Sequence, residues 1–459
     1  MTSPLEIIIL AAGKGTRMYS DTPKVLHQVA GVPLLGHVIR LARQLEPSNI
    51  HVIYGHGGQK VPDTIAEPGL NWVEQAEQLG TGHAVSQAMP AVNPGSTVLV
   101  LYGDVPLTRP ETLRNLVATA GDEVAVLTAI LDDASGYGRI IRNARGDVLA
   151  IVEQKDLSED QQKIREINSG YIVAPAEKMN DWLAALRNDN AAGEYYLTDI
   201  IAMAISNGVS VAGVVTEDND EIMGINNKQQ LAYLERVYQH RVADDLMSRG
   251  VTLRDRSRVD VRGTLTTGRD VEIDVNVVFE GDVRLGDRVQ IGPNCVLKDV
   301  EIAEGTTVFA SSVLDQAVIG KNCRIGPFAR IRPEANIADD AHIGNFVEVK
   351  KSTIGKGSKV NHLAYIGDTR MGSGVNIGAG TITCNYDGAN KHMTVIGDNA
   401  FIGSDTQLVA PVTVGDNATI GAGSTITADT PPDQLTLTRI KQKSIAGWKR
   451  PVKNKPAKD

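Results

Sequence analysis

The sequence contains few aromatic residues and no long hydrophobic run. Aromatic residues make up 4% of its 459 residues, whereas glycine occurs 45 times. That balance favours slim, stacked β-structure over sandwiches that pack around large rings. No apolar run approaches the roughly 18 residues of a membrane span, and the N-terminus lacks the positive segment of a secretion signal. We therefore expect a cytoplasmic protein with no membrane insertion.

Cysteine content and net charge exclude further classes. The three cysteines show no C-x-x-C metal pairing and cannot form a closed disulfide set, so we expect reduced, structural thiols at Cys295, Cys323 and Cys384. A net charge of −9 and a pI near 5.6 argue against a nucleic-acid partner or an anionic membrane surface. Any phosphate site must therefore use local cations. The length of 459 residues predicts two domains.

The C-terminal half carries a repeat of six residues. Aliphatic residues recur at this spacing, often followed by glycine, at Ile319, Ile325, Ile331, Ile337, Ile343 and Val349, and again at Ile396, Ile402, Leu408, Val414, Ile420 and Ile426. A short fixed period predicts a solenoid, here with three hexapeptides per triangular coil and about ten coils. The register breaks at residues 367–371 and between Thr383 and Ile396, where we expect projecting loops, and we associate His362 with the first break.

The N-terminal half alternates strand-like and helical segments. Apolar runs at residues 6–10, 50–54, 97–101 and 124–130 are separated by helical stretches such as 34–45. This alternation predicts a mostly parallel α/β sheet, whose ligands bind beyond the carboxyl ends of the strands. Asp104 follows one such run, where it is either a ligand-binding carboxylate or a simple capping residue.

A glycine-containing loop follows the first strand-like run. Residues 11–18 read Ala-Ala-Gly-Lys-Gly-Thr-Arg-Met, so that glycines could bring backbone N–H groups to a phosphate while Lys14 and Arg17 supply charge. The loop matches neither a Walker A motif nor a dinucleotide fingerprint. On the glycine pattern alone, a plain tight turn explains it equally well.

Residues 228–250 have apolar side chains at helical spacing and end in Gly250. We expect one helix of about 30 Å that connects the two halves. The alternative is a last helix packed on the first domain.

The order of several motifs resembles one bacterial enzyme family over residues 5–450. These motifs are Leu10-Ala-Ala-Gly-x-Gly-Thr-Arg-Met18, Pro23-Lys24, Gly80-Thr81, Tyr102-Gly103-Asp104, residues 361–368 (NHLAYIGD), Asn376 and residues 383–388 (TCNYDG). Together they are similar to the bifunctional enzymes that acetylate glucosamine-1-phosphate and then uridylylate it. The resemblance implies a Rossmann-like α/β nucleotidyltransferase domain at 1–228, a linker helix at 229–250, and a left-handed parallel β-helix with a basic tail at 251–459. It also implies a homotrimer formed through the β-helix.

The resemblance assigns residues to uridylyl transfer from UTP. It implies substrate contacts by Leu10, Ala11, Ala12, Gly13, Lys24, Gln75, Gly80, Thr81, Tyr102, Gly103, Asp104, Gly138, Glu153, Asn168 and Asn226. Asp104 and Asn226 match the family's Mg²⁺ ligands, and hard oxygen donors suit that ion. Ser169 stands where the family commonly has threonine, which retains the hydroxyl.

The resemblance also assigns residues to acetyl transfer from acetyl-CoA. His362 matches the general base, a role that suits histidine because its ordinary pKa lies near neutrality. Sugar-phosphate contacts are implied for Arg332, Lys350, Tyr365 and Asn376, and acetyl-CoA contacts for Ala379, Asn385, Tyr386, Ser404, Ala422 and Arg439. Arg439 could equally be a solvated surface residue.

Spacing supports two of these assignments. Arg332 and Lys350 are 18 residues apart, so they should stack on adjacent coils about 4.8 Å apart and repel each other unless an anion lies between them. Ser404 and Ala422 are also 18 residues apart and form a small-residue track suited to the acetyl-CoA arm.

Two other functions fit parts of the pattern. The chain could be a single-activity sugar nucleotidyltransferase whose solenoid only serves assembly, or a non-catalytic scaffold with degenerate sites. His362 and the Arg332/Lys350 pair argue against the first, and Lys24, Asp104 and Asn226 argue against the second.

Overall fold

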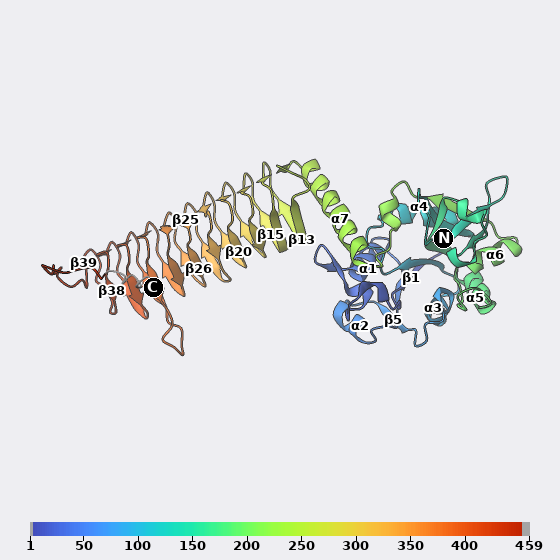
Figure 1. The fold of residues 1–459 in the computed structure, drawn as a ribbon, viewed down its shortest axis with the longest axis horizontal. Helices are drawn as coiled ribbons and strands as arrows, with labels where there is room; N and C mark the ends of the chain where they lie inside the picture. The colour runs from blue at the N-terminus through green and yellow to red at the C-terminus, as the bar shows by residue number, and fades with distance from the viewer. Residues whose placement is uncertain (1–2, 452–459) are drawn as a thin grey trace, which may run out of the picture. The chain divides into compact units, whose positions relative to one another are not determined.

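The computed structural model describes residues 3–451, and the chain divides into two compact units, Met1–Asp245 and Leu246–Asp459. In Figure 1 the first unit shows a sheet flanked by helices, and the second shows a ladder of short strands. Among the described residues, no helix combines the length and the apolar character that crossing a bilayer requires.

One mixed sheet forms the centre of the first unit. Its strands are β1 (Leu5–Leu10), β4 (Asn49–Tyr54), β5 (Asn71–Glu74), β6 (Thr97–Tyr102), β7 (Val124–Ile130), β8 (Arg139–Arg142), β9 (Val148–Val152), β10 (Glu166–Pro175) and β11 (Val211–Val215). The order is β11-β7-β10-β6-β1-β4-β5, with β8 on β10 and β9 on β8. β1 pairs in parallel with β4 and β6, whereas β10 runs antiparallel to β6 and β7. The predicted α/β sheet is confirmed, with β10 as its antiparallel member.

Helices cover both faces of this sheet. They are α1 (Leu34–Arg43), α2 (Lys60–Ile65), α3 (Thr81–Ala88), α4 (Pro110–Ala120), α5 (Ala176–Ala184) and α6 (Asp199–Ser206). Successive side chains of a strand point to opposite faces. Accordingly, Ile7 and Ile9 of β1 pack in one core with α1 and α4, while Ile8 packs in another with α3, α5 and α6. A small β-ribbon of β2 (Gln28–Val29) and β3 (Val32–Pro33) precedes α1.

Helix α7 (Lys228–Ser248) has 21 residues and is therefore about 31 Å long. Leu234 is fully buried in a cluster with Met18, Leu34 and Leu107, and Leu231 and Tyr238 pack against the same cluster. The predicted helix is confirmed. Its first half is the last helix of the first unit, which agrees with the alternative considered from the sequence.

Two long parallel sheets make up most of the second unit. The first contains β12 (Thr252–Leu253), β14 (Glu272–Ile273), β16 (Gln290–Ile291), β19 (Thr307–Val308), β22 (Arg324–Ile325), β25 (His342–Asn345), β28 (Lys359–His362), β31 (Asn376–Ile377), β34 (Phe401–Ile402), β37 (Thr419–Ile420) and β39 (Leu435–Thr436). The second contains β13 (Val259–Thr267), β15 (Val277–Leu285), β17 (Val296–Lys298), β18 (Glu301–Ile302), β20 (Val313–Asp315), β21 (Ala317–Ile319), β23 (Arg330–Ile331), β24 (Ala335–Ile337), β26 (Glu348–Lys350), β27 (Thr353–Ile354), β29 (Tyr365–Gly367), β30 (Thr369–Met371), β32 (Ile382–Cys384), β33 (Thr394–Ile396), β35 (Gln407–Val409), β36 (Val412–Val414) and β38 (Thr425–Ile426).

The pairing confirms the predicted parallel β-helix. Ile319 pairs with Ile337, Ile325 with Ile343, and Ile331 with Val349, which is one 18-residue step in each case. All six side chains are at most 1% exposed. The repeating aliphatic position is therefore the core position of each coil.

The prediction of a projecting loop at residues 367–371 is wrong. At residues 367–371 the chain continues through β29 and β30, and Ile354 pairs with Met371 across a coil shortened to 17 residues. The second interruption is confirmed: the chain leaves the coil between β32 and β33 and projects from the ladder in the orange region of Figure 1. After Ile426, β39 adds one more strand by pairing with β37, although the sequence showed no period there. The final part of the predicted basic tail, residues 452–459, lies outside the described residues.

Candidate active sites

A cavity opens at the carboxyl ends of β1 and β6 in the first unit. Its volume is about 460 Å³. Ten residues predicted for uridylyl transfer line it, namely Leu10, Ala11, Ala12, Gly13, Lys24, Gln75, Gly80, Thr81, Tyr102 and Asp104. Five further lining residues were not assigned as substrate contacts from the sequence: Lys14, Val25, Gln78, Ala84 and Glu194. Lys14 was expected to supply charge near the loop, whereas Arg17 is not among the lining residues.

The glycine-containing loop is held close to Lys24. Gly15 has φ +59°, and a Cβ there would lie 2.6 Å from the Cβ of Lys24. Only glycine meets both the conformation and the close approach. The loop therefore brings its backbone to the side of the cavity where Lys24 lies.

The Lys24 ammonium group lies where side-chain oxygens of Asp104 and Asn226 come together. Its ammonium group forms an ion pair with Asp104 Oδ2 and donates to Asn226 Oδ1 at 3.2 Å. The Lys24 and Asp104 side chains are only 13% and 15% exposed. The backbone N–H of Ile225 donates to the Asp104 carbonyl at 3.0 Å, which joins the segment that carries Asn226 to the segment that carries Asp104. A carboxylate and an amide oxygen thus face one cation position.

Gly138, Glu153 and Asn168 do not line the cavity but form a group of contacting residues, of which Glu153 acts on Tyr102. A Cβ on Gly138 would lie 3.5 Å from Glu153 Oε2, and the Asn168 N–H donates to the Gly138 carbonyl at 2.9 Å. Glu153 accepts a hydrogen bond from Thr198 at 3.0 Å, and burial raises its pKa. Burial, together with the Glu153 and Asp104 carboxylates, raises the pKa of Tyr102, so its hydroxyl stays protonated.

Gly103 is a close-packing position rather than part of the cavity lining. A Cβ there would lie 3.2 Å from the Cβ of Ala11 and 3.3 Å from the Leu10 carbonyl oxygen. Its N–H donates to that same carbonyl at 2.9 Å. Gly103 therefore joins the ends of β1 and β6 directly before Asp104.

In the second unit, Arg332 and Lys350 follow paired core residues on neighbouring coils, as predicted. The Arg332 N–H donates to the Val349 carbonyl at 2.8 Å. However, Arg332 also forms an ion pair of 2.7 Å with Glu348, so a protein carboxylate already balances its charge. The sequence spacing did not predict this carboxylate partner of Arg332, and the anion between Arg332 and Lys350 stays a prediction.

A further cation near Lys350 is Lys391, and the Asp368 carboxylate also acts on it. The neighbouring Lys350 side chain lowers the pKa of Lys391. Lys391 lies in the projecting loop, where it forms an antiparallel bridge with Tyr386. Sequence spacing could not identify Lys391, because the loop has no register with the coils.

His362 ends the regular strand β28, so its association with a break in the repeat is wrong. It pairs in register with Asn345, whose Oδ1 lies 3.1 Å from His362 Nδ1. The imidazole is exposed. Asn376 pairs with Lys359 of the same strand from the next coil. Asn345 was missed from the sequence, although its place 17 residues before His362 is one shortened coil.

Tyr365 and the projecting loop meet beside these residues. Asn385 Nδ2 lies 3.5 Å from the Tyr365 hydroxyl and also donates to the buried Asp368 carboxylate. Tyr386 is 60% exposed and donates to the Gly388 carbonyl at 2.6 Å. Asn385 is thus held by the coil, whereas the Tyr386 ring faces solvent.

The predicted small-residue track is formed by successive coils. A Cβ on Gly403 would lie 2.4 Å from the backbone nitrogen of Ala422, and Gly423 donates to the Ser404 carbonyl at 2.8 Å. Ala379 precedes them by one coil, since its carbonyl accepts from Asp405 at 2.7 Å. The Arg439 guanidinium lies 3.6 Å from the Cβ position of Gly421, so this side chain lies against the track.

Comparisons with known proteins agree with this two-unit organisation. Residues 7–189 match the MobA-like NTP transferase domain, residues 393–428 the bacterial transferase hexapeptide (six repeats), and residues 261–335 the GMPPB C-terminal domain. The chain is 57% identical to the bifunctional protein GlmU of Nitrosospira multiformis over 459 residues, covering 100% of both chains. The chain belongs to the GlmU family. The same protein of Azoarcus sp. is 57% identical over 98% of this chain and 100% of its own, and that of Marinobacter nauticus 55% over the same shares.

As a GlmU-family member, the chain is a bifunctional enzyme with a nucleotidyltransferase domain and a hexapeptide acetyltransferase domain. This confirms the family, the fold class and the activity expected from the motifs. Nucleotide substrates and a divalent metal are typical of its first domain. Within residues 3–451, no group of three or more His, Cys, Asp or Glu side chains could hold a metal by itself.

Proposed function

We propose that this chain makes UDP-N-acetylglucosamine in two steps at two separate sites. Glucosamine-1-phosphate is first acetylated by acetyl-CoA, and the product then receives UMP from UTP with release of pyrophosphate. The observation that carries this proposal is that each unit holds its own set of polar groups, each suited to one reaction. We assign uridylyl transfer to residues 1–228 and acetyl transfer to residues 251–459, joined by the helix at 229–250.

Uridylyl transfer needs charge neutralisation and alignment. A phosphate oxygen of the sugar attacks the α-phosphorus of UTP in line with the leaving pyrophosphate. Lys24 is suited to contact phosphate, while the backbone from Leu10 to Gly13, with Gln75, Gly80 and Thr81, is suited to hold the uridine. The buried amide of Gln75 donates to the Gly80 carbonyl at 3.1 Å, so these two contacts are pre-oriented. Tyr102, together with the neighbouring Gly138, Glu153 and Asn168, would contact the sugar.

A magnesium ion fits the donor set. Asp104 and Asn226 offer hard oxygens on one cation position, which the Lys24 ammonium contacts in this structure. Mg²⁺ commonly takes one or two protein oxygens and completes its shell with phosphate and water. When bound, it would neutralise phosphate charge. Lys24 would then turn from Asp104 towards the phosphates.

Acetyl transfer needs a base beside a neutral amine. With Asn345 Oδ1 accepting from Nδ1–H, Nε2 of His362 keeps its lone pair and can take the proton of the attacking amine. The nitrogen attacks the thioester carbonyl and the thiol of CoA leaves. Arg332, Lys350, Tyr365 and Asn376 are suited to the sugar phosphate. Acetyl-CoA would lie along Ala379, Asn385, Tyr386, Ser404, Ala422 and Arg439.

A homotrimer through the β-helix is part of the proposal. Phe328, Phe346 and Leu363 occupy the same corner of successive coils and are 52%, 55% and 63% exposed. The two phenylalanine rings stack at 5.3 Å. An apolar row of this kind is suited to packing against other copies of the chain.

Two variants test the assignment. The protein is supplied with Mg²⁺, UTP, acetyl-CoA and glucosamine-1-phosphate, and free thiol and pyrophosphate are measured separately. His362→Ala should lower thiol release by about 100-fold or more, because the base is lost, and should spare pyrophosphate release from N-acetylglucosamine-1-phosphate. Asp104→Ala should lower pyrophosphate release and should spare thiol release.

Each variant serves as the control for the other. Loss of both activities in a folded protein after either change would contradict the two-site assignment. Pyrophosphate formation by the unmodified protein without any thiol release would leave a single-activity nucleotidyltransferase. Release of neither product would indicate a binding scaffold.

A further inference from the structure

The segment that carries Asn226 is short and is held at both ends. It runs from residue 223 to residue 227, between the 3-10 helix Asn219–Ile222 and helix α7. Asn226 itself is oriented locally, since its N–H donates to Gln230 Oε1 at 2.7 Å. The position of Asn226 opposite Asp104 therefore depends on how the 3-10 helix and α7 are fixed to the loop that follows Asp104.

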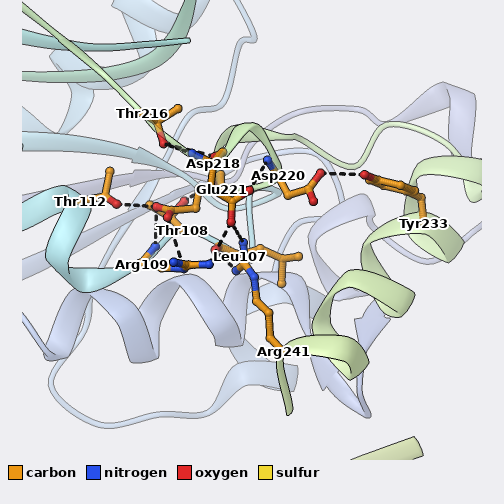
Figure 2. Close-up of polar contacts among 10 residues, drawn as sticks. All are labelled: Leu107, Thr108, Arg109, Thr112, Thr216, Asp218, Asp220, Glu221, Tyr233 and Arg241. Atoms are coloured by element: carbon orange, nitrogen blue, oxygen red, sulfur yellow. Dashed lines mark hydrogen bonds and ion pairs between the residues drawn. The ribbon is translucent and has the colours of Figure 1, made fainter. Parts of the chain in front are cut away.

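Glu221 fixes the 3-10 helix to that loop. Its carboxylate is buried and accepts from the Thr112 hydroxyl at 2.6 Å and from the Arg109 N–H at 3.1 Å, at the start of α4. Its backbone carbonyl accepts from Thr108 at 2.6 Å. A carboxylate at a helix N-terminus is also favoured by the helix dipole. Figure 2 shows Glu221 at the centre of this group.

Arg241 joins α7 both to Asp218, just before the 3-10 helix, and to Leu107, in the loop after Asp104. Its guanidinium donates to the Leu107 carbonyl at 2.6 Å and to Asp218 Oδ2 at 2.9 Å (Figure 2). The same Asp218 oxygen accepts from Arg109 at 2.9 Å. One planar, permanently charged group thus bridges α7, the segment before Asn226 and the loop after Asp104.

Tyr233 adds a second link between α7 and the 3-10 helix. Its hydroxyl donates to Asp220 Oδ1 at 2.9 Å (Figure 2). The network also reaches the cavity wall, because Thr108 shares a 2.8 Å hydrogen bond with the Tyr171 hydroxyl. The Tyr171 ring in turn lies 6.4 Å, centroid to centroid, from that of Tyr102.

We infer that Arg241, with Glu221 and Asp218, positions Asn226 against Asp104 and thereby sets the affinity of the uridylyl transfer site for its divalent cation. This inference rests on the metal site proposed above. Arg241 is a positioning residue, because its contacts are with the segments that carry the two donors. Loss of its bridge loosens the flanks of the 223–227 segment, which keeps the hydrogen bond from the Ile225 N–H to the Asp104 carbonyl. Both oxygen ligands and Lys24 stay chemically intact.

The test compares Arg241→Gln with Arg43→Gln in the full chain. Arg43 of α1 makes the same kind of bridge, to the Glu67 carboxylate and the Pro68 carbonyl, both at 2.8 Å, but it does not contact the network. Arg241→Gln should raise the Mg²⁺ concentration for half-maximal uridylyl transfer about tenfold, with most of the rate recovered at saturating Mg²⁺. Mn²⁺ binding, followed by electron paramagnetic resonance in the presence of UDP-N-acetylglucosamine, should weaken by a similar factor. Arg43→Gln should change neither quantity.

Arg241→Lys covers the case in which the glutamine variant fails to fold. Lysine keeps the positive charge but lacks the two-nitrogen fork of arginine, so the metal dependence of this variant should lie between those of the unmodified protein and the glutamine variant. Equal metal dependence of the folded Arg241 variants and Arg43→Gln would overturn the inference, as would a lower maximal rate without any change in metal dependence. Asp104→Asn separates the two proposals: if it leaves Mn²⁺ binding unchanged, the metal site itself is wrong.

Discussion

At the residue scale, Gly170 controls how close the backbone of β10 comes to Tyr102. It has φ +94°, and a Cβ there would lie 2.4 Å from the Tyr102 ring. Gly146 has a similar φ of +90°, but a Cβ there would meet nothing within 4 Å. The two glycines therefore share a positive φ, but Gly170 is buried in β10 beside the Tyr102 ring, whereas Gly146 is exposed in a turn.

Comparing Gly170→Ala with Gly146→Ala isolates the contact with Tyr102. Gly146→Ala should cost about 1 kcal/mol of stability, from its left-handed backbone alone. Gly170→Ala should cost about 3 kcal/mol, because the ring must also move, and should raise KM for N-acetylglucosamine-1-phosphate. Denaturant unfolding and uridylyl transfer kinetics measure these effects. Equal losses in the two variants would mean that the Tyr102 contact is unimportant.

At the scale of elements, α7 combines two tasks in one helix. Leu234 is buried among Met18, Leu34 and Ile225, while Tyr233 and Arg241 make the polar contacts that hold the Asn226 segment. The apolar contacts stabilise the helix on the first unit. The polar contacts determine where the residues just before it lie.

Truncating the apolar contact should destabilise the first unit. Leu234→Ala leaves a cavity beneath α7 and should cost about 2–4 kcal/mol. Met247→Ala, at a side chain that is 38% exposed, should change stability by less than about 0.5 kcal/mol. Thermal unfolding followed together with uridylyl transfer gives the comparison. An unfolding midpoint of Leu234→Ala that matches that of Met247→Ala would show that the cluster adds little stability.

At the scale of the whole molecule, two chemistries with different requirements occupy two units. The proposed acetyl transfer site uses His362, Asn345 and the cations Arg332 and Lys350 on a rigid β-helix. Its proposed steps need no metal. The proposed uridylyl transfer site depends on oxygen donors from distant parts of the chain. The two activities should therefore respond separately to removal of divalent ions.

Chelation by EDTA tests this separation. It should abolish pyrophosphate formation from UTP and N-acetylglucosamine-1-phosphate, because the phosphate charge is no longer neutralised. Thiol release from acetyl-CoA and glucosamine-1-phosphate should continue at its original rate. Added Mg²⁺ should restore the first activity fully, and a parallel loss of thiol release would contradict independent sites.

Periodic features could be predicted from the sequence because the repeat imposes register. Once Ile331 and Val349 occupy the same position of adjacent coils, the placement of Arg332 beside Lys350 follows from counting. In the same way, short apolar runs and the spacing of Leu231 and Leu234 predicted the strands and α7. Motif resemblance supplied the proposed site residues, ten of which line one cavity.

Contacts between segments without a common period were decided only by the tertiary structure. The ion pair of Glu348 with Arg332, the approach of Lys391 to Lys350, and the link from Asn345 to His362 depend on side-chain direction and on the path of loops. The bridge from Arg241 to Asp218 and Leu107 joins three separate segments of the chain. Local sequence determines which strands and helices form, because periodicity acts over neighbouring residues. Which distant side chains meet is determined only when those elements pack.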